Sequence, residues 1–391
     1  MDESLNYAAD FIRNGNNIYF VEEFVPILLH LKCLFLSLMY GLRFLRLQNQ
    51  IAREHVWQFQ EGDASYQYDF YSLIKDDWYA SFVGATGFSG LLCYFGFKKL
   101  IAKTYSKKCL YFLENQPWER ALVYANDTSG HKMEVFGYQH ATVSRLLLSY
   151  FNDRSETKEQ GTYLLARPDK IVCNGRIPAT YMQECGWSQN RIIGVEAIRY
   201  NHLRSYLYNV QTEKIKTKEN IVLVVCSIGS QESAALISVV YESLKDMEGI
   251  KLWLKPHPFL NLKQIFQFAD ISPENNVFTI VDKPMDQLLP SVRVAIVGGS
   301  GVALEAITFG CHVIVMEVPE WFNMSPLRGI PTPLVDIVHS PETLREKVQW
   351  IVKSQFDPQS SFRASEEVIN RFFNLNQDTN IPGKFLQLLS S

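Results

Sequence analysis

The C-terminal half of the chain alternates short apolar runs with segments whose apolar residues recur at helical spacing. The apolar runs predict strands at 221–227, 251–255, 277–281, 292–297 and 312–317. A predicted helix follows each of them, and continuous apolar strands separated by helices are typical of a doubly wound parallel sheet. The pattern therefore predicts an α/β domain of the Rossmann-like type.

The first half repeats this rhythm less regularly, after a helix-rich opening portion. Strands are predicted at 109–113, 134–138, 170–173 and 191–196, so we expect a second α/β domain. Residues 211–219 read QTEKIKTKE and show no apolar periodicity, which predicts a linker. The predicted domains are therefore 1–210 and 219–391. By analogy with other two-domain folds, we expect a helix over 363–375 to pack back across the first domain.

An apolar run over 24–45 is long enough for a membrane-spanning helix, but a proline and basic residues interrupt or flank it. These residues are Pro26, His30, Lys32, Arg43 and Arg46. Charged groups are costly inside a bilayer, and two interpretations remain. The segment is either an amphipathic helix buried in the protein, or a helix lying on the inner leaflet with Arg43, Arg46 and Arg53 towards the lipid headgroups.

The length of 391 residues exceeds what one hydrophobic core usually organises, which also favours two domains. A net charge of -3 provides no global field that would attract nucleic acid. Seven cysteines occur without a CxxC pair or zinc-like spacing, which predicts buried free thiols in a reducing compartment and no metal site. The opening MDES lacks the features of a secretory signal, so we expect a cytoplasmic protein.

Candidate chemistry begins at the end of the predicted strand 251–255, where Lys255-Pro256-His257-Pro258 follows. Ligands of open α/β sheets bind at the carboxyl ends of strands. The two prolines stiffen the turn on both sides of His257. His257 could then donate to a phosphate or nucleotide oxygen while Lys255 supplies a positive charge. The alternative is a turn with a solvated Lys255 and a His257 bonded to the backbone.

The predicted strand 292–297 ends in Gly298-Gly299-Ser300-Gly301, and a segment of strong helix character follows. Small residues let a phosphate approach the backbone, where the amides, the helix dipole and the Ser300 hydroxyl favour an anion. We therefore assign Gly299, Ser300 and Gly301 to a nucleotide site, with Glu305 accepting from a ribose or sugar hydroxyl. Alternatively, Glu305 only complements the helix dipole.

A third loop, 227–233, joins the first strand of this domain to its first helix, and we expect it to face a cleft between the domains. Gly229 and Ser230 are candidates for donor contact, although Ser230 could instead cap the helix. Glu232 is a reserve catalytic candidate, because a carboxylate at a helix start beside a cleft can act as a base or as a nucleophile.

Candidates for activating a hydroxyl group lie at strand ends of the first half. Glu114 and Glu119 follow the predicted strand 109–113, and His140 follows the predicted strand 134–138. Activation needs a base, which Glu114 or His140 could supply. The alternatives are a Glu114 carboxylate bonded to loop amides, and a Glu119 that pairs with Arg120 or caps the following helix.

Four short blocks occur in order in the first half: ENQPWERALVYA, GYQHATVS, RPDKIVCNG and GVEAIRYNHL. Together they resemble a family of bacterial surface carbohydrate (capsule or O-antigen) biosynthesis proteins, over a stretch from Asp77-Trp78-Tyr79 to Tyr200. The KPHP and Gly-Gly-Ser-Gly sequences resemble the histidine-proline and serine motifs of GT-B glycosyltransferases that use CMP-activated sialic acids or Kdo. The resemblance implies a GT-B-like α/β fold with two Rossmann-like domains facing a cleft and a helix-rich N-terminal portion.

On this resemblance Lys255, His257 and Ser300 contact the CMP moiety, while the first domain binds the acceptor and supplies the base. The chain departs from the family pattern in two places. Ser300 stands between glycines where relatives often carry two adjacent serines, and the acidic-acidic-glycine motif of some sialyltransferases has no clear counterpart. The identity of the base therefore stays open.

The implied function is transfer of a CMP-activated nonulosonic acid or Kdo to a surface polysaccharide or glycolipid acceptor, without a metal or other cofactor. The alternatives are a CDP-glycerol-type polyol-phosphate transferase and a non-catalytic sugar-binding or assembly protein. The expected partners are a nucleotide-sugar donor and a glycan or lipid-linked glycan acceptor, with peripheral contact at the inner face of the plasma membrane and no nucleic acid.

Overall fold

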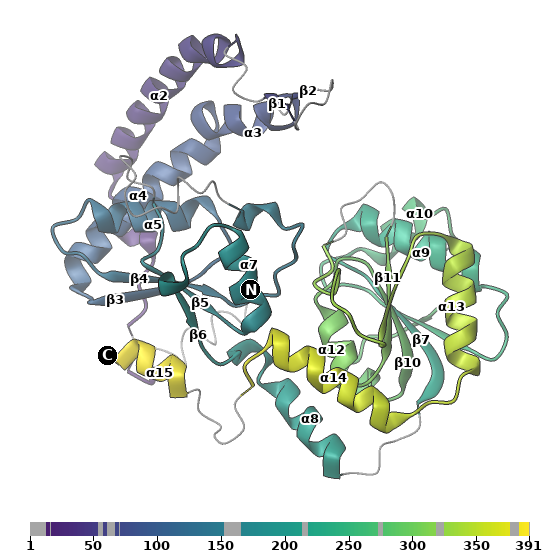
Figure 1. Cartoon of the computed structure of the whole chain (residues 1–391). Helices are drawn as coiled ribbons and strands as arrows, with labels where there is room; N and C mark the ends of the chain where they lie inside the picture. Colours follow the sequence, from purple (N-terminus) through teal and green to yellow (C-terminus); the bar gives the residue numbers. More distant parts are fainter. Residues whose placement is uncertain are drawn as a thin grey trace. The chain divides into compact units, whose positions relative to one another are not determined.

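The computed structural model describes residues 13–15, 17–53, 58–60, 67–69, 71–151, 166–212, 218–272, 277–317, 324–375 and 383–390. The chain forms two compact units (Figure 1). One comprises Met1–Gly137 and Gln160–Asp169, and the other comprises Tyr138–Glu159 and Lys170–Ser391. The predicted domains 1–210 and 219–391 stay a prediction.

Six strands form the sheet of the C-terminal half. They are β7 (Glu219–Val225), β8 (Lys251–Lys255), β9 (Thr279–Ile280), β10 (Val292–Val297), β11 (His312–Met316) and β12 (Val335–Val338). Their order is β12-β11-β10-β7-β8-β9, and every neighbouring pair is parallel. This is the doubly wound order of Rossmann folds, in which the strand order reverses beside the first strand. The predicted Rossmann-like domain is confirmed.

Helices connect these strands and cover the sheet. They are α9 (Ser230–Leu244), α10 (Leu262–Phe268), α11 (Met285–Leu288), α12 (Val302–Thr308) and α13 (Pro341–Lys353). All six residues of β10 are buried. Its Val294 and Ile296 lie in a core to which α9 contributes Ile237 and α13 contributes Leu344. Burial on both faces explains why β7 is a continuous apolar run over 221–225, whereas β10 includes one buried charged residue, Arg293.

A second sheet, of four strands, precedes this domain in the sequence. Its order is β3 (Lys108–Phe112), β4 (Glu134–Gln139), β5 (Lys170–Cys173) and β6 (Ile192–Gly194). Helix α5 (Pro117–Asp127) follows β3, α7 (Arg176–Glu184) follows β5, and β5 runs parallel to β6. Short 3-10 turns occupy Val21–Phe24, Leu148–Tyr150, Gln189–Arg191 and Ile198–Tyr200. All the strands predicted from the sequence are present, with ends shifted by at most about two residues.

The opening portion is helical, as predicted. It consists of α2 (Ile27–Arg53), α3 (Tyr71–Val83) and α4 (Ala85–Thr104), with a small antiparallel pair, β1 (Gln58–Gln60) and β2 (Gln67–Asp69). Among the described residues, α2 is long and apolar enough to cross a membrane. The segment Lys75–Val83 and α4 are long and apolar enough only when taken together, and the chain bends by 52° between them. Only 17% of the apolar stretch of α2 is buried, so the interpretation of this segment as a buried core helix is wrong.

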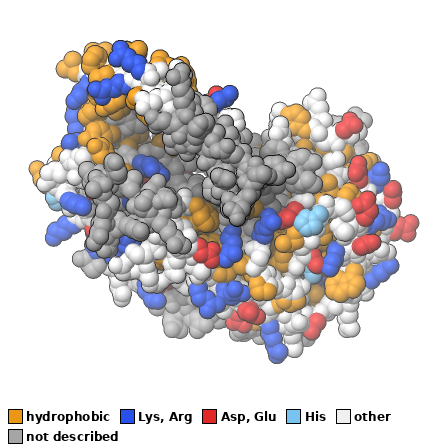
Figure 2. Space-filling view, turned by 45° about the horizontal axis from the view of Figure 1, so that its top comes forward, with side chains coloured by type: hydrophobic (Ala, Val, Ile, Leu, Met, Phe, Trp, Pro, Cys, Tyr) orange, Lys and Arg blue, Asp and Glu red, His pale blue; other side chains and the backbone are white. Residues whose placement is uncertain are grey.

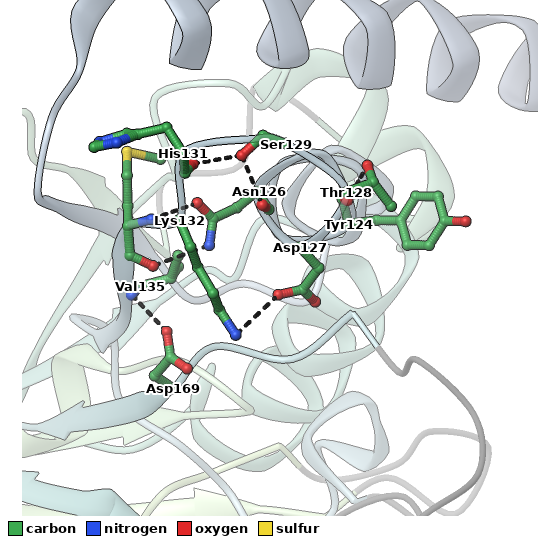
Figure 3. Close-up of polar contacts among 10 residues, drawn as sticks. Tyr124, Asn126, Asp127, Thr128, Ser129, His131, Lys132, Val135 and Asp169 are labelled. Atoms are coloured by element: carbon green, nitrogen blue, oxygen red, sulfur yellow. Dashed lines mark hydrogen bonds and ion pairs between the residues drawn. The ribbon is translucent and has the colours of Figure 1, made fainter.

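Polar contacts hold the connection from α5 to β4 (Figure 3). Asn126 is buried, donates from Nδ2 to the Met133 carbonyl at 3.0 Å and accepts at Oδ1 from the Met133 amide at 2.8 Å. Asp169 accepts from the Val135 amide at 2.8 Å. These bonds satisfy buried backbone groups of a tight turn, and they lie at the amino end of β4, away from the strand ends where ligands bind. The network therefore has a structural role.

The C-terminal helix packs back across the first half, as predicted. It is α14 (Pro358–Phe372), which packs against α12 and α7. The Asn374 amide, just beyond it, donates to the Asn174 carbonyl at 2.6 Å, and the Phe373 ring stacks on Tyr200 at 4.1 Å between centroids. A last helix, α15 (Gly383–Ser390), follows. The start of α14 lies before the predicted 363, because Asp357 accepts from two amides of its first turn and fixes the helix start.

Two details of the predicted chain path are wrong. The linker is shorter than 211–219, because α8 (His202–Thr212) includes the first two of those residues and β7 already includes Glu219. Residues 213–217 lie outside the described residues. The edge strand β12 was not predicted, and α13 follows it rather than β11. Its four residues, VDIV, include a central aspartate and are only partly buried, so they lack the continuous apolar run of β7.

Candidate functional site

Three of the predicted loops begin level with one another on adjacent strands. The register pairs Val225 of β7 with both Lys255 of β8 and Val297 of β10. Since neighbouring strands lie about 4.8 Å apart, the loops after β8 and β10 begin roughly 10 Å from each other, with the loop after β7 between them. β7 and β10 flank the reversal of the strand order, the usual ligand site of open α/β sheets.

Glu232 joins the two loops at this reversal. Its Oε1 accepts from the Gly299 amide at 2.9 Å, and its Oε2 accepts from the Ser227 hydroxyl at 2.5 Å. A Cβ on Gly298 would lie 2.6 Å from Oε1, so a side chain at this position would displace the carboxylate. The Gly299 amide thus has a protein partner, and its contact with a phosphate stays a prediction.

His257 lies in the turn after β8 and is half-buried. Its Nδ1 accepts from the Phe259 amide at 3.3 Å, which is the backbone-bonded arrangement we considered. A ring nitrogen that accepts carries no proton, so this bond assigns the proton of neutral His257 to Nε2, where it can be donated to a ligand. The side chain of Lys255 is only 16% exposed, and its Nζ lies 3.2 Å from Oδ1 of the fully exposed Asp282.

The remaining predicted contacts lie at the starts of α9 and α12. Ser300 accepts from the Val302 amide at 3.3 Å, which leaves its hydroxyl proton for donation. Gly229 is the N-cap residue of α9 and accepts at its carbonyl from the Ser233 amide at 2.9 Å. Ser230 is the first helical residue of α9, so the alternative that Ser230 caps this helix is wrong.

Residues that follow β4 and β6 approach α12 within the same compact unit. A Cβ on Gly301 would lie 3.0 Å from Thr142 Oγ1, so the backbone after β4 passes close to the glycine-rich loop. The Tyr200 hydroxyl, close to Thr142 and Glu305, is buried, and burial raises its pKa. The first half therefore contributes side chains to the surroundings of the predicted nucleotide loop.

Glu305 is the predicted hydroxyl acceptor on α12, and it is half-buried. Burial raises the pKa of its carboxyl, while His202 and Arg199 lower it. Sequence reasoning missed Thr142, Arg199 and His202 as neighbours of this helix. They belong to the blocks GYQHATVS and GVEAIRYNHL, but nothing in the spacing of these blocks shows which of their residues lies near a helix a hundred or more positions later.

The three predicted residues of the first half are divided between the compact units. Glu114 and Glu119 belong to the first unit, and His140 belongs to the unit that contains the three loops. Glu119 is buried and accepts from the Gln116 and Glu114 amides at 2.8 and 2.9 Å, which confirms that it caps α5. Burial raises the pKa of Glu119 although these amides lower it. His140 accepts at its carbonyl from Asn174 Nδ2 at 3.2 Å.

Cysteines and other metal-ligating groups form no cluster in the part of the chain that the structure describes. No three His, Cys, Asp or Glu side chains there are arranged to hold a metal ion. All seven cysteines are free, and burial raises the pKa of the Cys173 and Cys226 thiols to about 12. Because the thiolate is the reactive form, these two buried thiols are chemically inert.

No family model matches the chain, and no curated protein sequence matches it. Solved structures do match. A putative UDP-N-acetylglucosamine 2-epimerase from Listeria monocytogenes is 14% identical, with a TM-score of 0.50 over 74% of this chain and 77% of that chain. A glycosyltransferase from Rickettsia africae is 14% identical, with a TM-score of 0.48 over 77% of this chain and 81% of that chain.

A UDP-GlcNAc 2-epimerase from Methanocaldococcus jannaschii, in complex with UDP-GlcNAc and UDP, is 12% identical, with a TM-score of 0.47 over 73% of this chain and 82% of that chain. At these identities the likeness concerns the fold. The Listeria structure and the two sheets described above confirm the predicted fold class, an α/β fold of the GT-B type with two Rossmann-like domains and a helix-rich N-terminal portion.

Proposed function

We propose that this protein is a glycosyltransferase that takes a sugar from a nucleotide-sugar donor. The observation that carries the proposal is the alignment of three strand ends. The register pairs the last residues of β8, β7 and β10, so the loops that follow them begin side by side. Their hydrogen-bonding side chains lie at the reversal of the strand order. This row of polar groups is roughly 10 Å long. A nucleotide-sugar fits it, because the phosphate that links the sugar to the nucleoside can lie at the middle of the row, at the usual ligand site of such a sheet.

The donor phosphate lies between the turn after β8 and the loop after β10 in this proposal. His257 donates to the phosphate from Nε2, and Ser300 donates from its hydroxyl. Lys255 leaves its surface ion pair with Asp282 and places its positive charge beside the phosphate. Glu305 accepts from a ribose or sugar hydroxyl of the donor. Donors aimed at the leaving phosphate stabilise the charge that develops there during transfer.

His140 is the base that we propose for the acceptor. It stands two residues before Thr142, which approaches Gly301 of the donor loop. His140 removes the proton of the acceptor hydroxyl, the hydroxyl oxygen bonds to the anomeric carbon, and the bond from that carbon to the phosphate oxygen breaks. The phosphate leaves with the electron pair of that bond. Glu114, in the other compact unit, and Glu232 are the alternative bases.

The donor we propose is a CMP-activated nonulosonic acid or Kdo, and the acceptor is a surface polysaccharide or glycolipid. Support comes from the resemblance of the KPHP and Gly-Gly-Ser-Gly sequences to motifs that hold CMP. The Methanocaldococcus structure holds UDP and UDP-GlcNAc, which makes a UDP-linked sugar the competing donor. We also propose that transfer needs no metal, since a CMP-linked sugar already has a good leaving group.

Three rival functions predict different products. A polyol-phosphate transferase would consume CDP-glycerol. An epimerase, the activity named for two of the similar structures, would convert UDP-GlcNAc without releasing UDP. A non-catalytic binding protein would consume none of these donors.

The test is to incubate the protein with each donor in turn, with and without EDTA, and to measure released nucleotide and new products by mass spectrometry. We expect CMP release from a CMP-linked sugar, undiminished by EDTA, and its loss in His140→Ala with donor affinity retained. Exclusive use of CDP-glycerol, or epimer formation without nucleotide release, would overturn the proposal in favour of the corresponding rival.

A further inference from the structure

Helix α2 packs one face against its neighbours and leaves the opposite face uncovered. On the packed face, Cys33 and Phe44 are buried, and the Phe44 ring stacks on Phe82 of α3 at 4.7 Å between centroids. On the other face, large apolar side chains recur every three or four residues and are 37 to 78% exposed. We call them the apolar stripe: Ile27, Leu28, Leu31, Leu34, Phe35, Leu38, Leu42 and Leu45.

Basic residues border the apolar stripe, and no acidic residue occurs in α2. Arg43 and Arg46 are exposed, as is Lys32, whose Nζ lies 4.6 Å from the centre of the Phe95 ring of α4. At about 100° per residue, these three side chains lie along one edge of the stripe. Figure 2 shows hydrophobic side chains together with Lys and Arg on the helical portion of the molecule.

We propose that the apolar stripe of α2 binds the surface of a lipid bilayer that contains anionic lipids, with the helix lying parallel to that surface. Leu, Ile and Phe side chains enter the boundary between headgroups and acyl chains, and Arg43, Arg46 and Lys32 contact the headgroup phosphates. An apolar face bordered by cations is complementary to this surface in both polarity and charge. Arg53 lies beyond the side chains that the structure describes.

The packing of α2 favours a lying helix over a crossing one. The same helix contacts α3, which carries Lys75, Asp76 and Asp77 on its exposed surface. If α2 crossed the bilayer, these charges would be drawn towards the hydrocarbon core, where ionised groups are costly. A helix that lies on the surface keeps α3 and its charges in water.

The test is flotation of the full chain with phosphatidylcholine vesicles and with vesicles in which about a third of the lipid is phosphatidylglycerol. We expect binding to the anionic vesicles, weakened by added salt and released by high-salt washing at alkaline pH. In the unchanged protein, hydrogen exchange of α2 should slow when anionic vesicles are added. This second measurement does not depend on any variant folding.

Matched substitutions locate the contact. Phe35→Ser should weaken vesicle binding about tenfold, whereas Phe268→Ser, on α10, should leave it unchanged. Arg43→Gln should weaken binding to anionic vesicles roughly fivefold at low salt, and Arg363→Gln on α14 should not. Circular dichroism of each variant checks that the fold is kept.

Three results would each overturn the proposal. The first is absence of binding to both kinds of vesicle. The second is extraction only by detergent, which indicates a crossing helix. The third is a stable dimer in light scattering that Phe35→Ser dissociates, since the stripe then binds a second copy of the chain. None of them bears on donor turnover, so the proposed function stands or falls separately.

Discussion

At the scale of single residues, a backbone contact orients His257 in the proposed nucleotide site. Because the Phe259 amide donates to Nδ1, the ring is oriented and its proton resides on Nε2 before any ligand arrives. His257→Ala should therefore weaken nucleotide binding by about ten- to a hundredfold, the value of one hydrogen bond to a charged group. Isothermal titration calorimetry measures this loss, and His30→Ala, at an exposed position on α2, is the matched control. Equal affinities for His257→Ala and the unchanged protein would remove His257 from the site.

Glu305 provides a pH-dependent prediction. Burial raises the pKa of Glu305 in the folded protein, so in the window above its unfolded pKa the folded state binds more protons than the unfolded state. The contribution of Glu305 to the free energy of unfolding therefore falls as pH rises from about 4.3 through the raised folded pKa. Glu305→Gln mimics the protonated form and should lose this decline.

Urea unfolding at a series of pH values between 4 and 7 checks this prediction. Glu305→Gln should gain stability relative to the unchanged protein as pH increases across the window, and Glu242→Gln, at an exposed position of α9, should run parallel to the unchanged protein. A Glu305→Gln curve that also runs parallel would show that the carboxyl has an ordinary environment.

At the scale of elements, Glu232 fixes the distance between the starts of α9 and α12. Gly298→Ala places a Cβ 2.6 Å from the present position of Oε1, so the carboxylate must move and its bond to the Gly299 amide is lost. Loss of a half-buried hydrogen bond to a charged group should lower the free energy of unfolding by about 1.5 to 3 kcal/mol.

Chemical denaturation measures this effect, with Gly130→Ala as the control because a Cβ there meets nothing within 4 Å. Nucleotide affinity of Gly298→Ala then distinguishes two roles of Glu232. If displacement of the carboxylate frees the Gly299 amide for a phosphate, affinity rises. If Glu232 acts only by positioning the two loops, affinity falls with stability.

The inner strands of the six-stranded sheet could be predicted because burial on both faces produces apolar runs such as 221–225 in β7. Edge strand β12 could not, since a partly exposed strand tolerates Asp336. The three loops could be placed at strand ends by pattern alone. The three loops begin side by side because of the register of β8, β7 and β10. No local sequence pattern shows this register. Glu232 was a candidate by position. Its bond to Gly299 joins residues 67 positions apart and depends on β7 and β10 becoming neighbours.

At the scale of the whole molecule, the C-terminal segment links parts of the chain that lie far apart in sequence. Asn374 bonds to Asn174, and Phe373 stacks on Tyr200, which lies close to Glu305 of α12. One segment thus contacts the residues after β5 and β6, next to α12, the helix that follows the proposed donor loop. The sequence predicted the packing of this helix by analogy, whereas these contacts depend on the tertiary packing of residues that lie far apart in the chain.

The central claim is a nucleotide site at the aligned carboxyl ends of β8, β7 and β10. Thermal unfolding of the unchanged protein with CMP, CDP, UDP and GDP tests it most directly. Ligand at about a hundred times its Kd stabilises a protein by roughly 2.7 kcal/mol, which corresponds to a Tm increase of about 5 to 10 °C for a cooperatively unfolding unit of about 150 to 250 residues. We expect this increase with CMP and a smaller one with the other nucleotides. The same increase with UDP alone would keep the site and replace the donor, and no increase with any nucleotide would contradict the claim.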